Sequence, residues 1–288
     1  MTSRQKVVVG LLCGATIIGG AAWAEPLDRG AVTGQAAETP SVVALMDAAR
    51  LEPLVGVVAT EGARHAMGLE ASLFPGRGGE AWAEIVSAIQ APDRMSQMLA
   101  ETMASELPSD VMSEALAFYD TDLGAKVAER EVASRRAMLD AEVEARAMRA
   151  ASADAVDDRA ELLDDLIDSL GLIEANVSGG LNANYAFYRG LGDGGALSKR
   201  LTEREMLAMV WGQEPEVRES MDRWLRAYLT LAYEPLSDDE LRDYVAFSST
   251  APGRKMSAAL FAGFGRVFEE TSYDLGRAAA RFIAMQDA

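Results

Sequence analysis

The sequence predicts an all-α fold made of two related helical-bundle units joined by a long helix. Apolar residues recur with helical spacing along most of the chain, and no run alternates as a half-buried strand would. In addition, residues 82–126 align with residues 211–255 without a gap, which indicates an internal repeat. The matched pairs mix turn residues, aromatics and charges: Trp82/Trp211, Asp93/Asp222, Arg94/Arg223, Leu107/Leu236, Asp110/Asp239, Ala117/Ala246, Phe118/Phe247, Thr121/Thr250, Gly124/Gly253 and Lys126/Lys255.

The first 24 residues have the pattern of a secretory signal peptide. Arg4 and Lys6 precede an apolar run, and Ala22-Trp23-Ala24 forms a small-x-small exit. We expect cleavage after Ala24 and a periplasmic mature protein. An uncleaved membrane anchor is the alternative, because the apolar run is near the lower limit of a spanning length. Cys13 lacks the small preceding residue of a lipidated cysteine, which disfavours a lipoprotein.

Charge and cysteine content restrict the possible partners. The chain has a net charge of -18, and removal of the signal peptide leaves 25 basic against 45 acidic residues, a net charge of -20. Such a charge repels nucleic acid and anionic lipid headgroups, so we expect no nucleic-acid partner. No second stretch of spanning length follows, which predicts no stable membrane insertion after signal cleavage. The mature chain has no cysteine, so a packed core must stabilise it.

The first helical unit is predicted over residues 41–150, after a flexible N-terminal arm over residues 25–40 that is polar and contains glycine and proline. Within this unit, proline and clustered glycine mark the helix ends, and Ser109 and Thr121 are expected N-caps. The expected helical segments are 41–73, 80–89, 93–106, 109–119 and a long helix from 122 to about 150.

The long helix is predicted to connect the units with much of its surface in water. It is rich in alanine and charged residues, and Glu131/Arg135 and Glu142/Arg146 have the i,i+4 spacing of solvated pairs. A linker is expected over residues 151–158.

The second unit is predicted over residues 159–288, packed beside the first. An additional helix is expected over about residues 197–209, and Ser237 is the expected cap of the following hairpin. Pro252 suits a first helical turn, where its missing N–H has no intrahelical partner. The last helix should be buried along a bulky stripe formed by Met256, Leu260, Phe264, Val267 and Phe268.

The hairpin segments 117–126 and 246–255 resemble the signature of a secreted bacterial family, domain of unknown function 2059, which is approximately Phe-Tyr-x-Ser/Thr-Pro-x-Gly-x-Lys. Both copies depart from it: Asp122 replaces proline in the first, while in the second the proline is shifted to position 252 and Ser248 replaces tyrosine. The resemblance implies a helical envelope protein and no mechanism, since the activity of the family is undefined. We interpret the motif as a helix end, a cap and a helix start. Its residues are Phe118, Tyr119, Thr121, Gly124 and Lys126, then Phe247, Thr250, Pro252, Gly253 and Lys255.

Three groups of side chains have the chemistry of metal ligands, and a structural role is favoured for each. Glu61 and His65 share a helix face, but zinc normally needs further His or Cys ligands. A methionine run offers soft thioethers for Cu(I), although its spacing also suits core packing. An acidic turn offers oxygens but lacks a glycine-containing calcium loop. The last two groups are Met95, Met98, Met103 and Met112, and Glu161, Asp164, Asp165 and Asp168.

No catalytic, cofactor-binding or metal residues are therefore assigned. The sequence contains no Gly-x-Ser-x-Gly, His-Glu-x-x-His or phosphate-loop motif, and Gly192–Gly195 lacks the preceding strand of a nucleotide site. The prediction is a non-catalytic binding or scaffolding protein of the cell envelope, whose partner is an envelope protein or a small ligand. The alternatives are a carboxylate-based hydrolase with its site between the units, and a methionine-based copper-binding protein.

Overall fold

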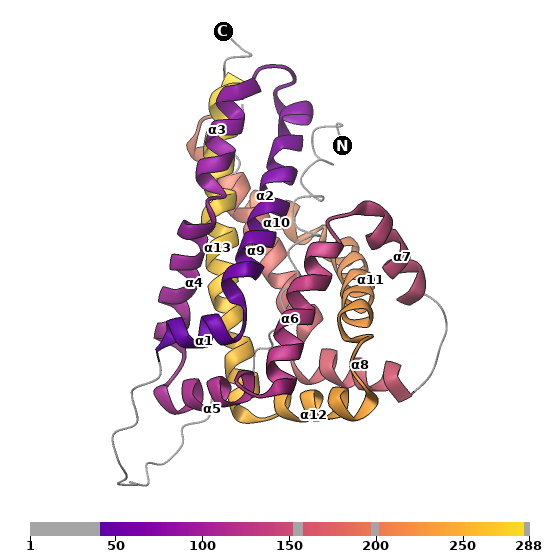
Figure 1. Cartoon of the computed structure of the whole chain (residues 1–288). Helices are drawn as coiled ribbons and strands as arrows, with labels where there is room; N and C mark the ends of the chain where they lie inside the picture. Colours follow the sequence, from indigo (N-terminus) through magenta and orange to yellow (C-terminus); the bar gives the residue numbers. More distant parts are fainter. Residues whose placement is uncertain (1–40, 152–157, 197–201, 285–288) are drawn as a thin grey trace.

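The computed structural model describes residues 41–151, 158–196 and 202–284, so the predicted signal peptide, the N-terminal arm and most of the predicted linker lie outside it. These ranges contain α-helices and no strand, which confirms the all-α prediction (Figure 1). The helices are α1 (Val42–Ala48), α2 (Leu51–Leu73), α3 (Gly79–Ile89), α4 (Pro92–Glu106), α5 (Ser109–Tyr119), α6 (Asp122–Ala137), α7 (Ala141–Ala151), α8 (Asp158–Ser169), α9 (Leu172–Asp193), α10 (Glu203–Trp211), α11 (Glu214–Tyr233), α12 (Asp238–Ser248) and α13 (Ala251–Ala284).

Helix starts follow local capping chemistry. Thr121 accepts a hydrogen bond from the Gly124 amide at 3.0 Å, and Ser237 forms a reciprocal capping box with Glu240, so both predicted caps are confirmed. Ser109 is the first residue of α5 and not its cap, which is Pro108. The helix predicted near residues 197–209 is α10, which begins at Glu203.

The prediction of one long connecting helix is wrong, because the helical structure is interrupted between α6, which ends at Ala137, and α7, which begins at Ala141. The Asp140 carboxylate accepts hydrogen bonds from the amides of Glu142 at 2.8 Å and Val143 at 3.3 Å, and so caps a new helix. The guanidinium of Arg64 donates to the carbonyl of Leu139 at 2.7 Å, which satisfies a group left free near the end of α6. As a result α7 turns back and packs against α11.

The two predicted units share their hydrophobic cores. Helix α13 runs along α9, α4 and α5, while α6 and α7 pack against α11. Within the residues that the structure describes, each of the three buried apolar clusters draws side chains from both the 41–150 and the 159–288 ranges. The stripe predicted on α13 is buried as expected, with Phe268 at its edge. The structure therefore does not confirm a side-by-side arrangement of separate units, and the domain boundaries stay a prediction.

One joint between helices has the same backbone conformation in both halves of the chain. Arg50 and Gly171, which precede α2 and α9, both have a left-handed backbone, with φ of 54° and 58°. The first pair in the alignment of residues 82–126 with 211–255 does not occupy matching places in the structure, however. Trp82 is completely buried near the start of α3, whereas Trp211 ends α10 and is 50% exposed.

Candidate functional site

A half-buried glutamate, Glu131, lies at the meeting point of α6, α11 and α12. Glu131 on α6 accepts hydrogen bonds from the hydroxyls of Tyr233 at 2.6 Å and Tyr244 at 3.1 Å, and its backbone carbonyl accepts from the hydroxyl of Tyr228 at 3.1 Å. Burial raises the pKa of the Glu131 carboxyl, and the two phenol hydrogen bonds lower it by less. Burial, followed by the nearby Glu131 carboxylate, raises the pKa of all three tyrosines.

An ion pair lies one turn further along α6. Arg135, with only 1% of its side chain exposed, donates to Glu61 of α2 through Nη2 at 2.5 Å and Nε at 2.8 Å. Its guanidinium also lies 4.8 Å from the ring centroid of Trp224, whose indole donates to Glu144 at 3.2 Å. Burial raises the pKa of Glu61, although Arg135 lowers it in part.

This polar cluster joins the two halves of the chain. Glu61, Glu131 and Arg135 belong to the first range, and their aromatic partners on α11 and α12 belong to the second. Buried ion pairs often contribute little net stability, but loss of one partner leaves a charge without compensation. The cluster therefore fixes how α6 sits against α2, α11 and α12.

Sequence patterns predicted Glu131 and Arg135 as a solvated i,i+4 pair, and this prediction is wrong. The two side chains have separate partners, Tyr233 for one and Glu61 for the other. A signal for their burial does exist in the helical register. Val127, Glu131, Arg135 and Met138 recur at intervals of three or four residues, and Val127 and Met138 are core residues.

The hairpin motif residues meet each other in the structure. Phe118 and Phe247 stack at 3.7 Å between ring centroids with an interplanar angle of 5°. The hydroxyl of Thr121 donates a hydrogen bond to the Phe118 carbonyl at 2.7 Å, and that of Thr250 donates to the Phe247 carbonyl at 2.6 Å. Each threonine hydroxyl also accepts a hydrogen bond from the amide of the following motif glycine.

Other motif positions differ between the hairpins. Lys126 forms an ion pair with Glu240 at 2.8 Å, whereas Lys255 is exposed. Pro252 lies in the first turn of α13, as predicted. Tyr119 is buried beside the stacked phenylalanines, where burial raises the pKa of its hydroxyl.

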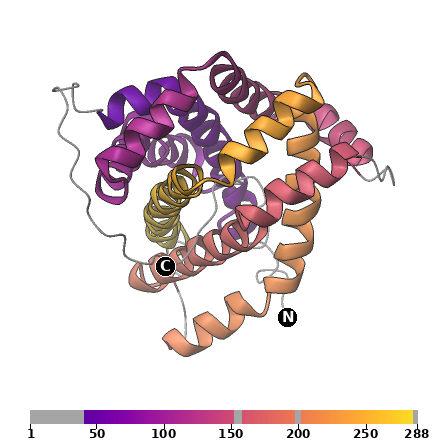
Figure 2. The same cartoon turned by 90° about the horizontal axis from the view of Figure 1, so that it is seen from below.

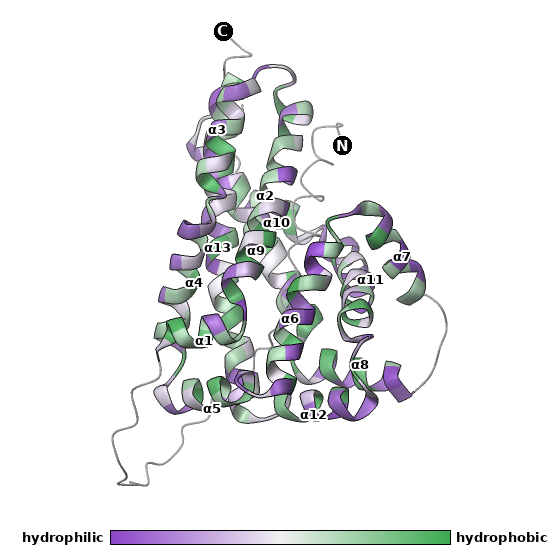
Figure 3. Ribbon diagram, in the orientation of Figure 1, coloured by the Kyte–Doolittle hydropathy of each residue, from purple (hydrophilic) through white to green (hydrophobic). Residues whose placement is uncertain are grey.

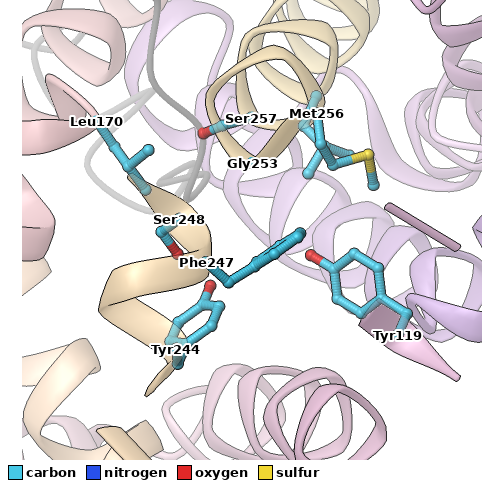
Figure 4. A pocket seen from close by; sticks show the side chains of 9 residues that line it. Tyr119, Leu170, Tyr244, Phe247, Ser248, Gly253, Met256 and Ser257 are labelled. Atoms are coloured by element: carbon cyan, nitrogen blue, oxygen red, sulfur yellow. The ribbon is translucent and has the colours of Figure 1, made fainter. Parts of the chain in front are cut away.

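A cavity of about 20 Å³ lies beside the stacked rings (Figure 4). Phe247 stands between Tyr119 and Tyr244 in its wall, and the hydroxyl groups of Ser248 and Ser257 also line it. A volume of this size holds roughly one water molecule. The cavity is lined by both polar and apolar groups and combines both halves of the chain, but it is too small for an organic substrate.

Glu61 and His65, the first pair of candidate metal ligands, lie in the protein interior or at its edge. The carboxylate of Glu61 is engaged by Arg135, while Nε2 of His65 is buried without a hydrogen-bond partner in the described residues. Burial lowers the pKa of His65. Within the described ranges, no three or more His, Cys, Asp or Glu side chains are grouped so that they could hold a metal ion.

The four methionines lie in one buried apolar cluster, which favours their role in core packing. The acidic turn on α8 is exposed to solvent, and Figure 3 shows hydrophilic and hydrophobic residues interspersed along this helix. One of its acids, Asp164, forms an ion pair with Arg226.

Helix α10 presents an unusual apolar face. Leu207 and Trp211, one turn apart, are 38% and 50% exposed, and Figure 2 shows α10 at the periphery of the molecule. Among the described helices, none is both long and apolar enough to cross a bilayer.

Comparison with known families identifies one segment of the chain. Residues 93–153, from α4 to the end of α7 and beyond, match a family described as "Uncharacterized protein conserved in bacteria (DUF2059)". Neither curated proteins nor solved structures gave a match. The match includes the first hairpin motif and not the second, so a second copy stays a prediction. Over residues 93–153, the chain therefore resembles the domain of unknown function 2059 family.

Proposed function

We propose that this protein is exported to the bacterial periplasm and acts there as a non-catalytic binding or scaffolding protein. The pattern of residues 1–24 supports export, and the acidic composition suits a protein that avoids nucleic acid and anionic membrane surfaces. We further propose that the second hairpin is a divergent copy of the first, because the paired Thr caps and Gly contacts have the same geometry.

The observation that carries the binding role is the apolar face of α10. A half-exposed tryptophan with a leucine one turn away loses unfavourable contact with water when a partner covers it. Tryptophan is also among the residues that contribute most to protein interfaces. The partner we favour is therefore another envelope protein, which covers Leu207 and Trp211.

The contacts of the two partly buried acids and the small size of the cavity support a non-catalytic role. The carboxyls of Glu61 and Glu131 are already bonded to Arg135 and to tyrosines, and the cavity near Tyr244 has room for about one water. A substrate would have to displace packed side chains to reach either acid.

Site-specific photo-cross-linking in intact cells tests the proposal. A photoreactive residue at position 211 or 207 should form a discrete adduct with one periplasmic protein, and the mature chain should begin at Glu25. The same residue at Arg130, which is exposed on α6, is the matched control and should form no such adduct. Retention of the chain in the cytoplasm, or equal labelling from position 130, would contradict the proposal.

A hydrolase is the second candidate, because two acids with raised pKa values, Glu61 and Glu131, both lie where the halves join. This alternative predicts turnover of an ester or glycoside that falls at least about a hundredfold in Glu131→Gln. Absence of turnover in the wild type, or unchanged turnover in that variant, rejects the candidate.

A further inference from the structure

Two tyrosines and two arginines alternate along the seam between α9 and α13. The Arg189 Cζ lies 5.9 Å from the ring centroid of Tyr185 and 5.7 Å from that of Tyr273. The Arg277 Cζ lies 5.9 Å from the same Tyr273 ring. Each helix contributes a tyrosine and an arginine four residues later, which places both members on one face of that helix.

Close packing of the two backbones brings these faces together. A Cβ on Gly190 would lie 2.2 Å from the carbonyl oxygen of Tyr273, and one on Gly276 would lie 2.2 Å from that of Phe187. Only glycine permits such an approach. The four side chains therefore form a continuous ladder, Tyr185, Arg189, Tyr273 and Arg277, across two helices far apart in sequence.

The acids near this ladder bond to its tyrosines. The Tyr185 hydroxyl donates to Glu203 at 3.0 Å, and the Tyr273 hydroxyl donates to Asp193 at 2.9 Å. In the described part of the chain, no carboxylate lies within ion-pair distance of Arg189 or Arg277, and both residues are exposed. Arg218 and Arg266, by contrast, each form two ion pairs.

We propose that Arg189 and Arg277 form a binding site for a small ligand that carries two or more anionic groups, either carboxylates or phosphates. A guanidinium presents N–H donors in a planar fork that matches both groups, and stacking on tyrosine reduces its freedom before binding. Two positive charges beside one ring repel each other, and a bridging anion removes that repulsion.

The net charge of -18 opposes anion binding at long range, so the site must rely on short hydrogen bonds. At about 0.15 M ionic strength the long-range repulsion is largely screened, because the Debye length is about 8 Å. The site goes beyond the proposed partner surface on α10 and uses different side chains, so either proposal can fail alone.

Calorimetric titration of the mature chain with inorganic pyrophosphate and with citrate tests the site. We expect one of these probes to bind, and that probe identifies phosphate or carboxylate as the preferred group. Arg189→Gln and Arg277→Gln should each weaken binding by roughly tenfold or more. Tyr273→Phe keeps the ring and should stay within about threefold of wild type, while Tyr273→Leu should weaken binding clearly.

Arg223→Gln is the matched control, because Arg223 is exposed on α11 outside the ladder. Its affinity should equal that of the wild type, and circular dichroism should show that every variant is folded. The proposal is overturned if neither probe binds up to about 10 mM. It is also overturned if both ladder variants bind as the wild type does, or if Arg223→Gln loses as much affinity as they do.

Discussion

Phe118 and Phe247, which occupy matching positions in the two helix hairpins, stack nearly parallel with 3.7 Å between ring centroids. Each residue precedes its own capping threonine and glycine, so the contact joins the two hairpins at their tips. The contact links helices whose sequences lie in different halves of the chain.

A double-mutant cycle should measure coupling between these rings. Because both are half-buried, Phe118→Ala and Phe247→Ala should each lower the free energy of unfolding by about 2 kcal/mol. The double variant should lose about 1 kcal/mol less than the sum, which is the contribution of the stack. Urea unfolding provides the values, and strict additivity would mean that the stack contributes nothing.

The motif glycines should not tolerate a methyl group. A Cβ at Gly124 would lie 2.1 Å from the Phe118 carbonyl oxygen, and one at Gly253 would lie 2.3 Å from that of Phe247. Either substitution to alanine should destabilise the protein by about 2 kcal/mol or more. Gly68→Ala is the control: its Cβ would meet nothing within 4 Å, so better helix propensity should stabilise the chain by about 0.5–1 kcal/mol. Similar effects at all three positions would refute the close-contact argument.

Removing Arg135 should leave the carboxylate of Glu61 without its ion-pair partner. Arg135→Met leaves Glu61 without its partner and should cost about 3–5 kcal/mol of unfolding free energy. The double variant Arg135→Met with Glu61→Gln should recover most of that loss, because no unpaired charge remains. If the double variant is no more stable than the single variant in chemical denaturation, packing and not charge explains the loss.

Stability should fall as pH rises because of Glu131. Burial raises the pKa of this carboxyl in the folded state above its ordinary value of 4.5. Its contribution is fully present below the unfolded pKa and is lost as pH rises through the folded pKa. Wild-type stability should therefore decrease as pH rises from 4.5 through the neutral range. The pKa of Glu61, which burial also raises, adds to the decrease.

Glu131→Gln mimics the protonated carboxyl and should be more stable than the wild type at the upper end of that range, with a shallower pH dependence. Thermal unfolding across the pH series checks this. A variant that is less stable at high pH, with the wild-type slope, would show that the site favours the carboxylate.

Capping chemistry and apolar periodicity made part of the fold predictable. Ser237, Thr121 and the buried stripe on α13 follow from local sequence, because their partners are within one or two turns. The break after Ala137 has no clear signal in the local sequence, because Asp140 resembles an ordinary surface acid.

The buried cluster could not be predicted from spacing alone. Glu131 and Arg135 have the spacing of a solvated pair, and their partners lie on other helices. Periodicity says which face of a helix is buried but not which distant helix covers it. For the same reason the shared cores and the Tyr185–Arg277 ladder emerged only from tertiary structure.

The halves of this chain fold on each other, because each buried cluster among the described residues draws on both. Residues 41–151 and 158–288 should be produced separately and together, and their thermal unfolding followed by circular dichroism. We expect no cooperative transition from either piece alone, and one shared transition from a one-to-one complex when they are co-expressed. A cooperative, native-like transition from either isolated piece would contradict the claim.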